Sequence, residues 1–323
     1  MIQERLKALR AEMEKRGITV YVVPTADFHE SEYVGDHFKA RKFITGFTGS
    51  AGTAVITLDE AGLWTDGRYF VQAENQLKDS TVTLYRMGEE GVPTVDEFVK
   101  DRLKEGGCLG FDGRVVNGTW GGRLEKIAAE KNVSMHVTED LIDLIWEDRP
   151  ALSKQPLFIL EEKYSGKSTA DKIADLRKAM KENGADVHIL TSLYDIAWLL
   201  NIRGNDIDYV PVVLSYLVLN ETECIWFLQE EVVDDTIRAY LKENHIETRP
   251  YDDIYTYVPT IPESAVVLMN KSSVNYRICS ELNKNIQVIN KPNPTELMKA
   301  VKNPVEVDNT RLAHVKDGVA VTK

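Results

Sequence analysis

The feature that most constrains the fold of this chain is an internal repeat. Residues 5–23 read RLKALRAEMEKRGITVYVV, and residues 172–190 read KIADLRKAMKENGADVHIL. Each segment predicts an amphipathic helix, a glycine that ends the helix, and a buried strand. Any helix of this kind before a strand would share some of the pattern, but five matches at one offset favour a duplicated domain. The matched positions are Leu9 and Leu176, Arg10 and Arg177, Met13 and Met180, Gly17 and Gly184, and Val20 and Val187.

Predicted strands and helices alternate after the first copy of the repeat. This alternation favours an α/β domain, and we expect the second copy to repeat it. Ser168 and Asp171 form a start like a capping box for the helix of the second copy. In the first half the predicted strands are 18–24, two within 53–70, 81–87, 108–112 and 133–137, and the predicted helices are 95–107 and 120–132.

Prolines mark the expected domain boundaries. Residues 140–156 predict a last helix that runs into a linker, bracketed by Pro150 and Pro156, and KPNPTE at 291–296 is a second connector. The chain length of 323 residues also favours more than one core. The predicted divisions are 1–153 for the first domain, 154–300 for a related second domain, and 301–323 for the start of a third.

The last segment predicts a helix with a well-marked start. Asn303 is a candidate N-cap, Pro304 stands at the first turn, and Glu306 is the reciprocal cap. The apolar residues that follow keep a helical spacing, and no stop signal precedes the end of the sequence. We expect a third domain that is truncated within its first helix; the alternative is a helix that docks back on the second domain. The apolar residues are Val305, Leu312, Val315 and Val319.

Composition narrows the classes of partner. The net charge of -12 argues against nucleic acid, because phosphate binding needs an excess of lysine and arginine. The N-terminal stretch is a charged amphipathic helix without the apolar region of a signal peptide, and no apolar run reaches transmembrane length. The cysteines Cys108, Cys224 and Cys279 are too far apart to suggest a disulfide framework or a metal pair. We therefore expect a cytoplasmic protein without a membrane partner, in which each cysteine is a small buried residue.

Motif searches find no complete catalytic site. GFTGSAG at 46–52 is neither a P-loop nor a nucleophile elbow, so we expect a tight turn there. SGKS at 165–168 lacks the glycine that a P-loop needs five positions earlier, where Glu161 stands. His29 lies in HESE and is a candidate for a weak metal site, although a solvated loop is the favoured interpretation. His188 alternates within a strand and is interpreted as a packed core residue.

The string LWTDGRYF at 63–70 is the most unusual in the chain. Asp66 and Arg68 flank a glycine between aromatic residues that favour strands. One interpretation is a hairpin turn that carries a surface ion pair. The other is an arginine projected from a strand end toward an anionic or carbonyl-bearing ligand, which its planar fork suits.

Seven strings in order resemble cytosolic Xaa-Pro aminopeptidase (aminopeptidase P). The resemblance covers nearly the whole chain, and WTDGRYF and the KAVKN helix start carry it most strongly. It implies an α/β fold with two tandem creatinase/prolidase N-terminal-type domains, each a mixed β-sheet flanked by helices and ribonuclease H-like, before a pita-bread catalytic domain. The strings are VPTADFHESEY (23–33), ITGFTGSAGTAVIT (44–57), LWTDGRYFVQA (63–73), IWEDRP (145–150), DIAWLLNIRGND (195–206), PVVLSY (211–216) and KAVKNPVEVDNTRLAHVKDGVAV (299–321).

The resemblance also implies an activity and its site residues. The family removes the N-terminal residue from peptides with proline in the second position, and uses two divalent metals, usually manganese, held by the third domain. No metal ligand or catalytic residue of the family falls in this chain, which is therefore expected to be inactive alone. Arg68 is implied to contact the peptide, and Asp66 to orient Arg68. The two domains are expected to narrow access to the site and to aid formation of a homodimer.

Two alternatives remain open at this point. One is a binding module, because metal-free pita-bread proteins exist, including a histone chaperone subunit with a similar N-terminal region. Its acidic surface would meet basic partners. The other is a prolidase- or creatinase-like hydrolase. WTDGRYF and two complete N-terminal copies favour the aminopeptidase, because the related dipeptidases usually carry one such domain.

Overall fold

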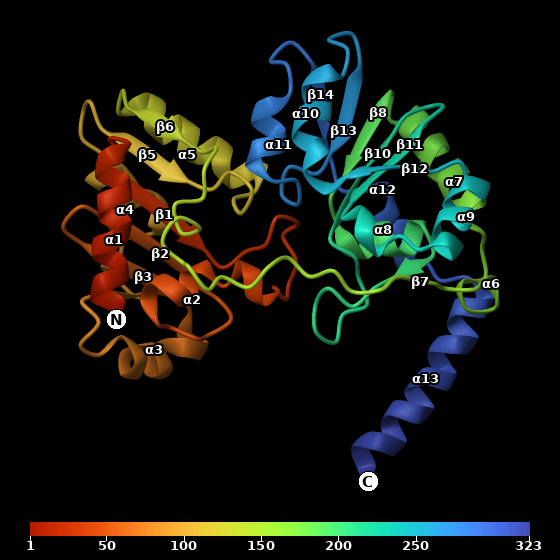
Figure 1. Ribbon diagram of the computed structural model, residues 1–323, viewed down its shortest axis with the longest axis horizontal. Helices are drawn as coiled ribbons and strands as arrows, with labels where there is room; N and C mark the ends of the chain where they lie inside the picture. Colours follow the sequence, from red (N-terminus) through yellow and green to blue (C-terminus); the bar gives the residue numbers. More distant parts are fainter. The chain divides into compact units, whose positions relative to one another are not determined.

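Two six-stranded mixed sheets organise the chain in the computed structural model, which describes residues 1–323 (Figure 1). They belong to two compact units. Unit 1 comprises Met1–Leu152 with Asn275–Ser280, and unit 2 comprises Ser153–Val274 with Glu281–Lys323. None of the helices combines the length and the hydropathy that a membrane-spanning segment needs.

Unit 1 contains a sheet of strand order β4-β3-β2-β1-β5-β6. The central strand β1 runs antiparallel to β2 and parallel to β5. The elements of unit 1 are α1 (Ile2–Lys15), β1 (Val20–Pro24), η1 (Asp36–Phe38), α2 (Ala40–Thr45), β2 (Thr53–Thr57), β3 (Ala61–Thr65), η2 (Gly67–Tyr69), α3 (Phe70–Leu77), β4 (Thr83–Arg86), α4 (Val95–Arg102), β5 (Cys108–Phe111), α5 (Gly118–Glu130) and β6 (Ser134–His136).

Unit 2 repeats this topology, with strand order β12-β11-β10-β8-β13-β14. Its central strand β8 again runs antiparallel to one neighbour, β10, and parallel to the other, β13. The duplication predicted from the repeat is therefore confirmed. The elements are β7 (Phe158–Ile159), α6 (Glu162–Ser165), α7 (Thr169–Glu182), β8 (Val187–Leu190), α8 (Leu193–Leu199), β9 (Ile202–Arg203), β10 (Ser215–Leu219), β11 (Cys224–Leu228), η3 (Glu230–Val232), α9 (Asp235–Glu243), β12 (Glu247–Pro250), η4 (Tyr251–Asp253), α10 (Ile254–Tyr257), η5 (Val258–Thr260), β13 (Val266–Met269), α11 (Tyr276–Glu281, mostly in unit 1), β14 (Gln287–Asn290), α12 (Pro294–Ala300) and α13 (Pro304–Thr322).

The pleat of β1 divides the core of unit 1 into two clusters. Tyr21 and Val23 pack with residues of α1, α2 and α3, whereas Val20 and Val22 pack with residues of α4 and α5. Successive side chains of a strand point to opposite faces, so a strand that is apolar at every position is buried on both sides. The sheet of unit 1 is therefore covered by helices on both faces.

The predicted ends of the two repeated helices are confirmed. Gly17 and Gly184 adopt the left-handed conformation, with φ of +67° and +69°, where glycine carries no steric cost. Leu9 and Leu176 are fully buried on the apolar faces of α1 and α7. The N-cap of α7 is also as predicted, because the Ser168 hydroxyl accepts a hydrogen bond from the backbone of Asp171.

The helix predicted to begin at 140 and to run into a linker by 156 is wrong. The segment makes only isolated turns, such as the bond from the Trp146 amide to the Ile142 carbonyl. The Asp140 carboxylate accepts from the Ile142 amide and pairs with Arg149, which closes the chain on itself. Pro150 further restricts Arg149 to extended backbone. The apolar spacing that suggested a helix serves instead to bury Leu141 against the core of unit 1.

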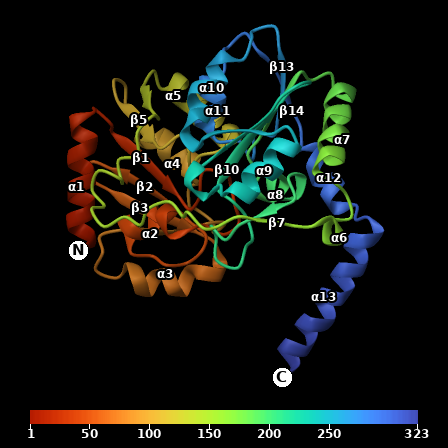
Figure 2. The same cartoon turned by 45° about the vertical axis from the view of Figure 1, so that its right-hand side comes forward.

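Helix α13 starts as predicted. Asn303 and Glu306 form a reciprocal capping box, and Pro304 occupies the first turn. Asn309 donates to the Lys163 carbonyl of α6, so the first turns lie on α6. The later apolar residues Leu312, Val315 and Val319 are exposed. Figures 1 and 2 both show α13 extending away from the rest of unit 2.

Candidate functional site

The predicted binding residues lie where β3 passes into a helix. Strand β3 ends at Thr65, and Asp66 caps the short helix η2 by accepting from the Arg68 amide at 3.1 Å. Helix α3 follows directly at Phe70. The hairpin interpretation of this turn is therefore wrong, because no strand returns after it. The strand-to-helix turn instead places Arg68 beyond the end of a buried strand.

Asp66 and Arg68 form an exposed bidentate ion pair. Nε of Arg68 donates to Oδ1 of Asp66 and Nη2 donates to Oδ2, each at 2.9 Å. The hydrogen bonds from Arg68 lower the pKa of Asp66 to about 2, so the pair is charged at neutral pH. The Arg68 side chain is 70% exposed and its Nη1 makes no hydrogen bond. Nη1 is therefore a free donor for a carbonyl or carboxylate oxygen of a ligand.

Two hydroxyl groups lie beside this pair. Tyr69, next to Arg68 on η2, places its hydroxyl 2.6 Å from the Ser50 hydroxyl. The Arg68 guanidinium lies over the Tyr69 ring, with Cζ 5.2 Å from the ring centroid. Ser50 is exposed and Tyr69 is half-buried. The hydrogen bond between Ser50 and Tyr69 thus joins the loop at 46–52 to the turn at 66–69.

The glycine-rich loop is held by Arg41. Its guanidinium donates to the carbonyl oxygens of Phe47 and Gly49 and to the hydroxyl of Thr25. A Cβ on Gly49 would lie 2.2 Å from the Phe47 ring, so only glycine fits there. The tight turn predicted for this loop is not seen: Gly46 ends α2 in the left-handed conformation (φ +78°), and residues 47–52 reach β2 without a hydrogen-bonded turn. Sequence reasoning missed Arg41, Ser50 and Tyr69, because no charge pattern near them in the sequence marks them as partners.

The histidines do not gather at this surface. His29 itself is 2% exposed, whereas Glu30, Glu32 and Tyr33 after it are exposed, so the loop is solvated as expected but the imidazole is buried. His188 is fully buried in β8 with Nδ1 3.0 Å from the Leu268 carbonyl, as expected of a core residue, and burial lowers its pKa. No group of three or more histidine, cysteine, aspartate or glutamate side chains in the chain could hold a metal ion.

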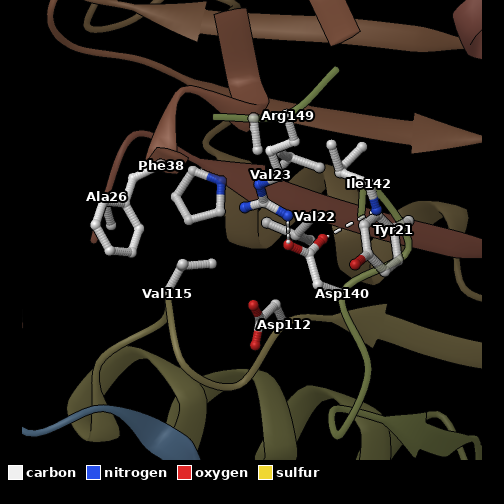
Figure 3. Close-up of a pocket in the computed structure, with 12 residues that line it drawn as sticks. Tyr21, Val22, Val23, Ala26, Phe38, Asp112, Val115, Asp140, Ile142 and Arg149 are labelled. Atoms are coloured by element: carbon white, nitrogen blue, oxygen red, sulfur yellow. Dashed lines mark hydrogen bonds and ion pairs between the residues drawn. The ribbon is translucent and has the colours of Figure 1, made fainter. Parts of the chain in front are cut away.

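A small cavity in unit 1, lined mainly by apolar residues and one buried ion pair, has a structural role. Figure 3 shows Arg149 reaching toward Asp140, with Asp112 and Tyr21 nearby. The cavity measures about 10 Å³, room for roughly one water molecule. Nη1 of Arg149 donates to Asp140 at 2.6 Å, and the two side chains are 6% and 7% exposed. Nothing of substrate size fits there.

Unit 2 has a larger open cleft next to α8 and the start of α13, with a volume of about 590 Å³. The arginine of the IRGND string, Arg203, lines it and donates to the carbonyls of Ala197 and Ile202. The aspartate of that string, Asp206, accepts from the Leu214 amide at 2.8 Å. These side chains hold backbone in place and thus differ from the exposed pair at Asp66 and Arg68.

Comparison with known proteins gives consistent matches for the two halves. Residues 5–145 and residues 148–306 each match a family model described as Creatinase/Prolidase N-terminal domain. Over 99% of its length the chain is 37% identical to "Probable Xaa-Pro aminopeptidase P" of Sordaria macrospora, covering 54% of that protein. It is 34% identical to "Aminopeptidase P1" of Arabidopsis thaliana, covering 54% of it.

A solved structure matches nearly all of the fold. It is an X-prolyl aminopeptidase from Caenorhabditis elegans, described as a cytosolic enzyme with a di-nuclear active site. The TM-score is 0.92 at 31% identity, over 99% of this chain and 55% of that one. The chain thus spans about half the length of the proteins it matches.

Proposed function

The chain belongs to the creatinase/prolidase N-terminal domain family through both of its halves, and from this premise we propose that it is the N-terminal, non-catalytic region of an Xaa-Pro aminopeptidase. The observation that carries the proposal is the match of 99% of the chain to an X-prolyl aminopeptidase at a TM-score of 0.92. The binding-module and dipeptidase alternatives have no comparable support.

The proposal extends to the whole enzyme. Its substrates are peptides with proline in the second position, its reaction is hydrolysis of the bond before that proline, and it works in the cytoplasm as a homodimer. Two divalent metals, with manganese as the proposed identity, supply the Lewis acid and the activated water. The di-nuclear site described for the Caenorhabditis elegans enzyme supports the metal count.

The residues of this chain do not fit a metal pair. No group of three or more potential ligands occurs among them. We therefore propose that units 1 and 2 contribute to substrate access and binding, and the chain alone is proposed to be inactive.

Arg68 is the proposed peptide contact. Its free Nη1 donates to backbone carbonyls of the substrate beyond the proline, while Asp66 fixes the plane of the guanidinium through two hydrogen bonds. Exposure supports this role, because a guanidinium that is 70% exposed can meet a ligand without prior rearrangement. An Asp66→Asn substitution would loosen the orientation but leave the charge of Arg68.

The test uses the whole gene product that contains this chain, an X-Pro-Pro peptide and Mn²⁺, with release of the first residue as the readout. Arg68→Ala is expected to raise KM for peptides that extend beyond the proline by about ten-fold, the usual worth of one hydrogen bond to a charged group. Arg123→Ala is the matched control, because Arg123 is also exposed and paired with an aspartate, Asp96, at 2.9 Å.

Two outcomes would contradict the proposal. If the whole gene product releases no residue from any X-Pro peptide, the proposed activity is wrong. If it does, and Arg68→Ala has the same KM as Arg123→Ala, the activity stands and the role of Arg68 is wrong.

A further inference from the structure

Arg41 is a buried cation without a carboxylate partner. Arg41 is 4% exposed. Its guanidinium donates hydrogen bonds to the Thr25 hydroxyl at 2.9 Å, to the Phe47 carbonyl at 2.6 Å and to the Gly49 carbonyl. All three acceptors are neutral. Burial lowers the pKa of Arg41 to about 10, so the group still carries its charge at neutral pH. A buried charge that no opposite charge compensates is costly, and such groups often serve a ligand.

Aromatic rings connect Arg41 to the exposed surface. Cζ of Arg41 lies 4.7 Å from the centroid of the Phe47 ring. Phe47 meets Tyr69 edge to face, at a centroid separation of 6.0 Å, and the Arg68 guanidinium lies over the Tyr69 ring. The guanidinium groups of Arg41 and Arg68 therefore lie at the two ends of a pair of aromatic rings, Phe47 and Tyr69. Only one carboxylate, that of Asp66, bonds to either of them.

The surface next to these two rings offers two kinds of hydrogen-bond donor, a hydroxyl group and a guanidinium N–H. Ser50 and Tyr69 share one hydrogen bond of 2.6 Å, so one of the two hydroxyl protons is left for a further acceptor. Nη1 of Arg68 is a second free donor. Two positive charges against one negative leave a local excess of positive charge, in a chain whose net charge is -12. An oxygen ligand that carries a negative charge fits this surface better than a neutral carbonyl does.

We propose that Ser50, Arg68 and Tyr69 bind the C-terminal carboxylate of a short peptide substrate, and that Arg41 is the positioning residue that holds the loop of Ser50 and supplies the uncompensated charge beneath it. The inference rests on the proposed function and deepens it, because it makes the enzyme selective for short peptides with a free C-terminus. A long peptide presents a neutral carbonyl at the same place and lacks the electrostatic attraction between a carboxylate and this positively charged surface.

The experiment compares Ala-Pro-Ala with its C-terminal amide in the whole gene product. The wild type is expected to have a kcat/KM about ten-fold higher for the acid, which is the usual worth of a charge-assisted hydrogen bond. Tyr69→Phe and Ser50→Ala should bring the ratio of acid to amide close to one while hydrolysis of the amide continues. Tyr33→Phe is the control, since the Tyr33 side chain is exposed in the same unit and makes no hydrogen bond.

Arg41 requires a readout that mere loss of structure would not change. Misfolding lowers turnover of acid and amide alike, whereas loss of positioning lowers their ratio. Arg41→Lys keeps the charge and loses the fork, and is expected to keep part of the preference; Arg41→Met is expected to abolish it. Equal ratios in the wild type and in Arg41→Met would remove Arg41 from the proposal.

A binding measurement separates this inference from the activity. Amide resonances of Ser50 and Arg68 are followed while this chain is titrated with Ala-Pro-Ala or its amide. Shifts with the acid that are weaker with the amide and absent in Tyr69→Phe support the carboxylate site even if no hydrolysis is found. Equal responses to both peptides, or none to either, overturn it. An active enzyme without acid preference overturns the inference and leaves the proposed function standing.

Discussion

Asp140 and Arg149 show what a single buried ion pair contributes to unit 1. Both side chains are less than 10% exposed, and Arg149 also donates to the His37 carbonyl at 2.9 Å. Removing one partner of such a pair leaves the other charge buried and unpaired. This destabilises the fold by far more than the intact pair stabilises it, because burying both charges already costs their hydration. The cost falls on the segment that closes the first domain.

We expect Arg149→Ala to lower the free energy of unfolding by about 3–5 kcal/mol, because it leaves Asp140 buried and unpaired. Guanidinium denaturation measures the change. Arg123→Ala, which breaks an exposed pair, should cost at most about 1 kcal/mol. Equal effects of the two substitutions would show that the buried pair is no more costly to break than a surface pair.

The buried Lys172 is expected to make the stability of unit 2 depend on pH. Its residue is 1% exposed, and Nζ donates to the Trp198 carbonyl at 2.8 Å and to the Asn201 side chain at 2.7 Å. Burial lowers the pKa of Lys172 to about 8, below its usual 10.5. The neutral amine retains two donors, so both hydrogen bonds can survive loss of the proton. Between these two pH values the unfolded chain therefore binds more protons than the folded chain.

Stability relative to Lys172→Met is therefore expected to rise between about pH 8 and pH 10.5, by about 3 kcal/mol in total. Below pH 8 the difference between the two proteins should be constant. Denaturation midpoints of the wild type and of Lys172→Met are measured across this pH range. All other titrating groups are present in both proteins, so their contributions cancel in the difference. A difference that is flat to pH 10.5 would mean that Lys172 titrates at its ordinary value when folded.

At the scale of elements, Gly166 permits the junction of α6 and α13. It follows α6 with φ of +67°, and a Cβ there would lie 2.3 Å from Oδ1 of Asn303 and 2.7 Å from Cβ of Val305. Asn303 also donates to the Ser165 carbonyl at 2.8 Å while it caps α13. The start of α13 therefore lies against backbone that only glycine leaves accessible.

Gly166→Ala should cost more stability than Gly184→Ala. Both glycines have positive φ, but a Cβ on Gly184 meets nothing within 4 Å, so that variant isolates the backbone cost of about 1–2 kcal/mol. The clash at Gly166 is expected to add about 1–3 kcal/mol and to speed amide exchange in the first turn of α13. Identical costs for the two variants would show that α13 shifts freely away from α6.

At the scale of the whole molecule, each unit has a sheet and a core of its own. Cys108 belongs to a core cluster of unit 1 and Cys224 to the core of unit 2, and burial raises the pKa of Cys224 to about 12. Both thiols are buried in the folded protein, so a thiol reagent reaches each of them only when its unit opens. They report separately on the opening of the two units.

In a Cys279→Ser background, Arg149→Ala is expected to speed labelling of Cys108 about ten-fold or more and to change labelling of Cys224 little. The reason is that local opening follows the stability of the unit that contains the thiol. Mass spectrometry after pulses of a thiol reagent gives the two rates. Equal acceleration at both cysteines would mean that the two units open together.

Local patterns in the sequence were enough to predict much of this fold. Contacts within a few residues determine the helix ends at Gly17 and Gly184 and the caps at Ser168 and Asn303. Simple apolar periodicity predicts the duplicated α/β topology. The bidentate pair of Asp66 and Arg68 is equally local, because a single residue, Gly67, separates its partners. The role of Arg68 toward a peptide stays a prediction, as do the boundaries of the three divisions.

What the sequence by itself determined is therefore the set of elements and their order, since short-range hydrogen bonds and apolar periodicity specify them. Tertiary structure alone decided which distant groups meet. It kept 140–156 from forming a helix and paired Asp140 with Arg149, and it buried the His29 side chain within a loop that is otherwise exposed. It also placed Arg41 among neutral acceptors, beneath Tyr69 and Ser50. Burial and pairing of charges depend on neighbours that are remote in the sequence, and no local pattern records them.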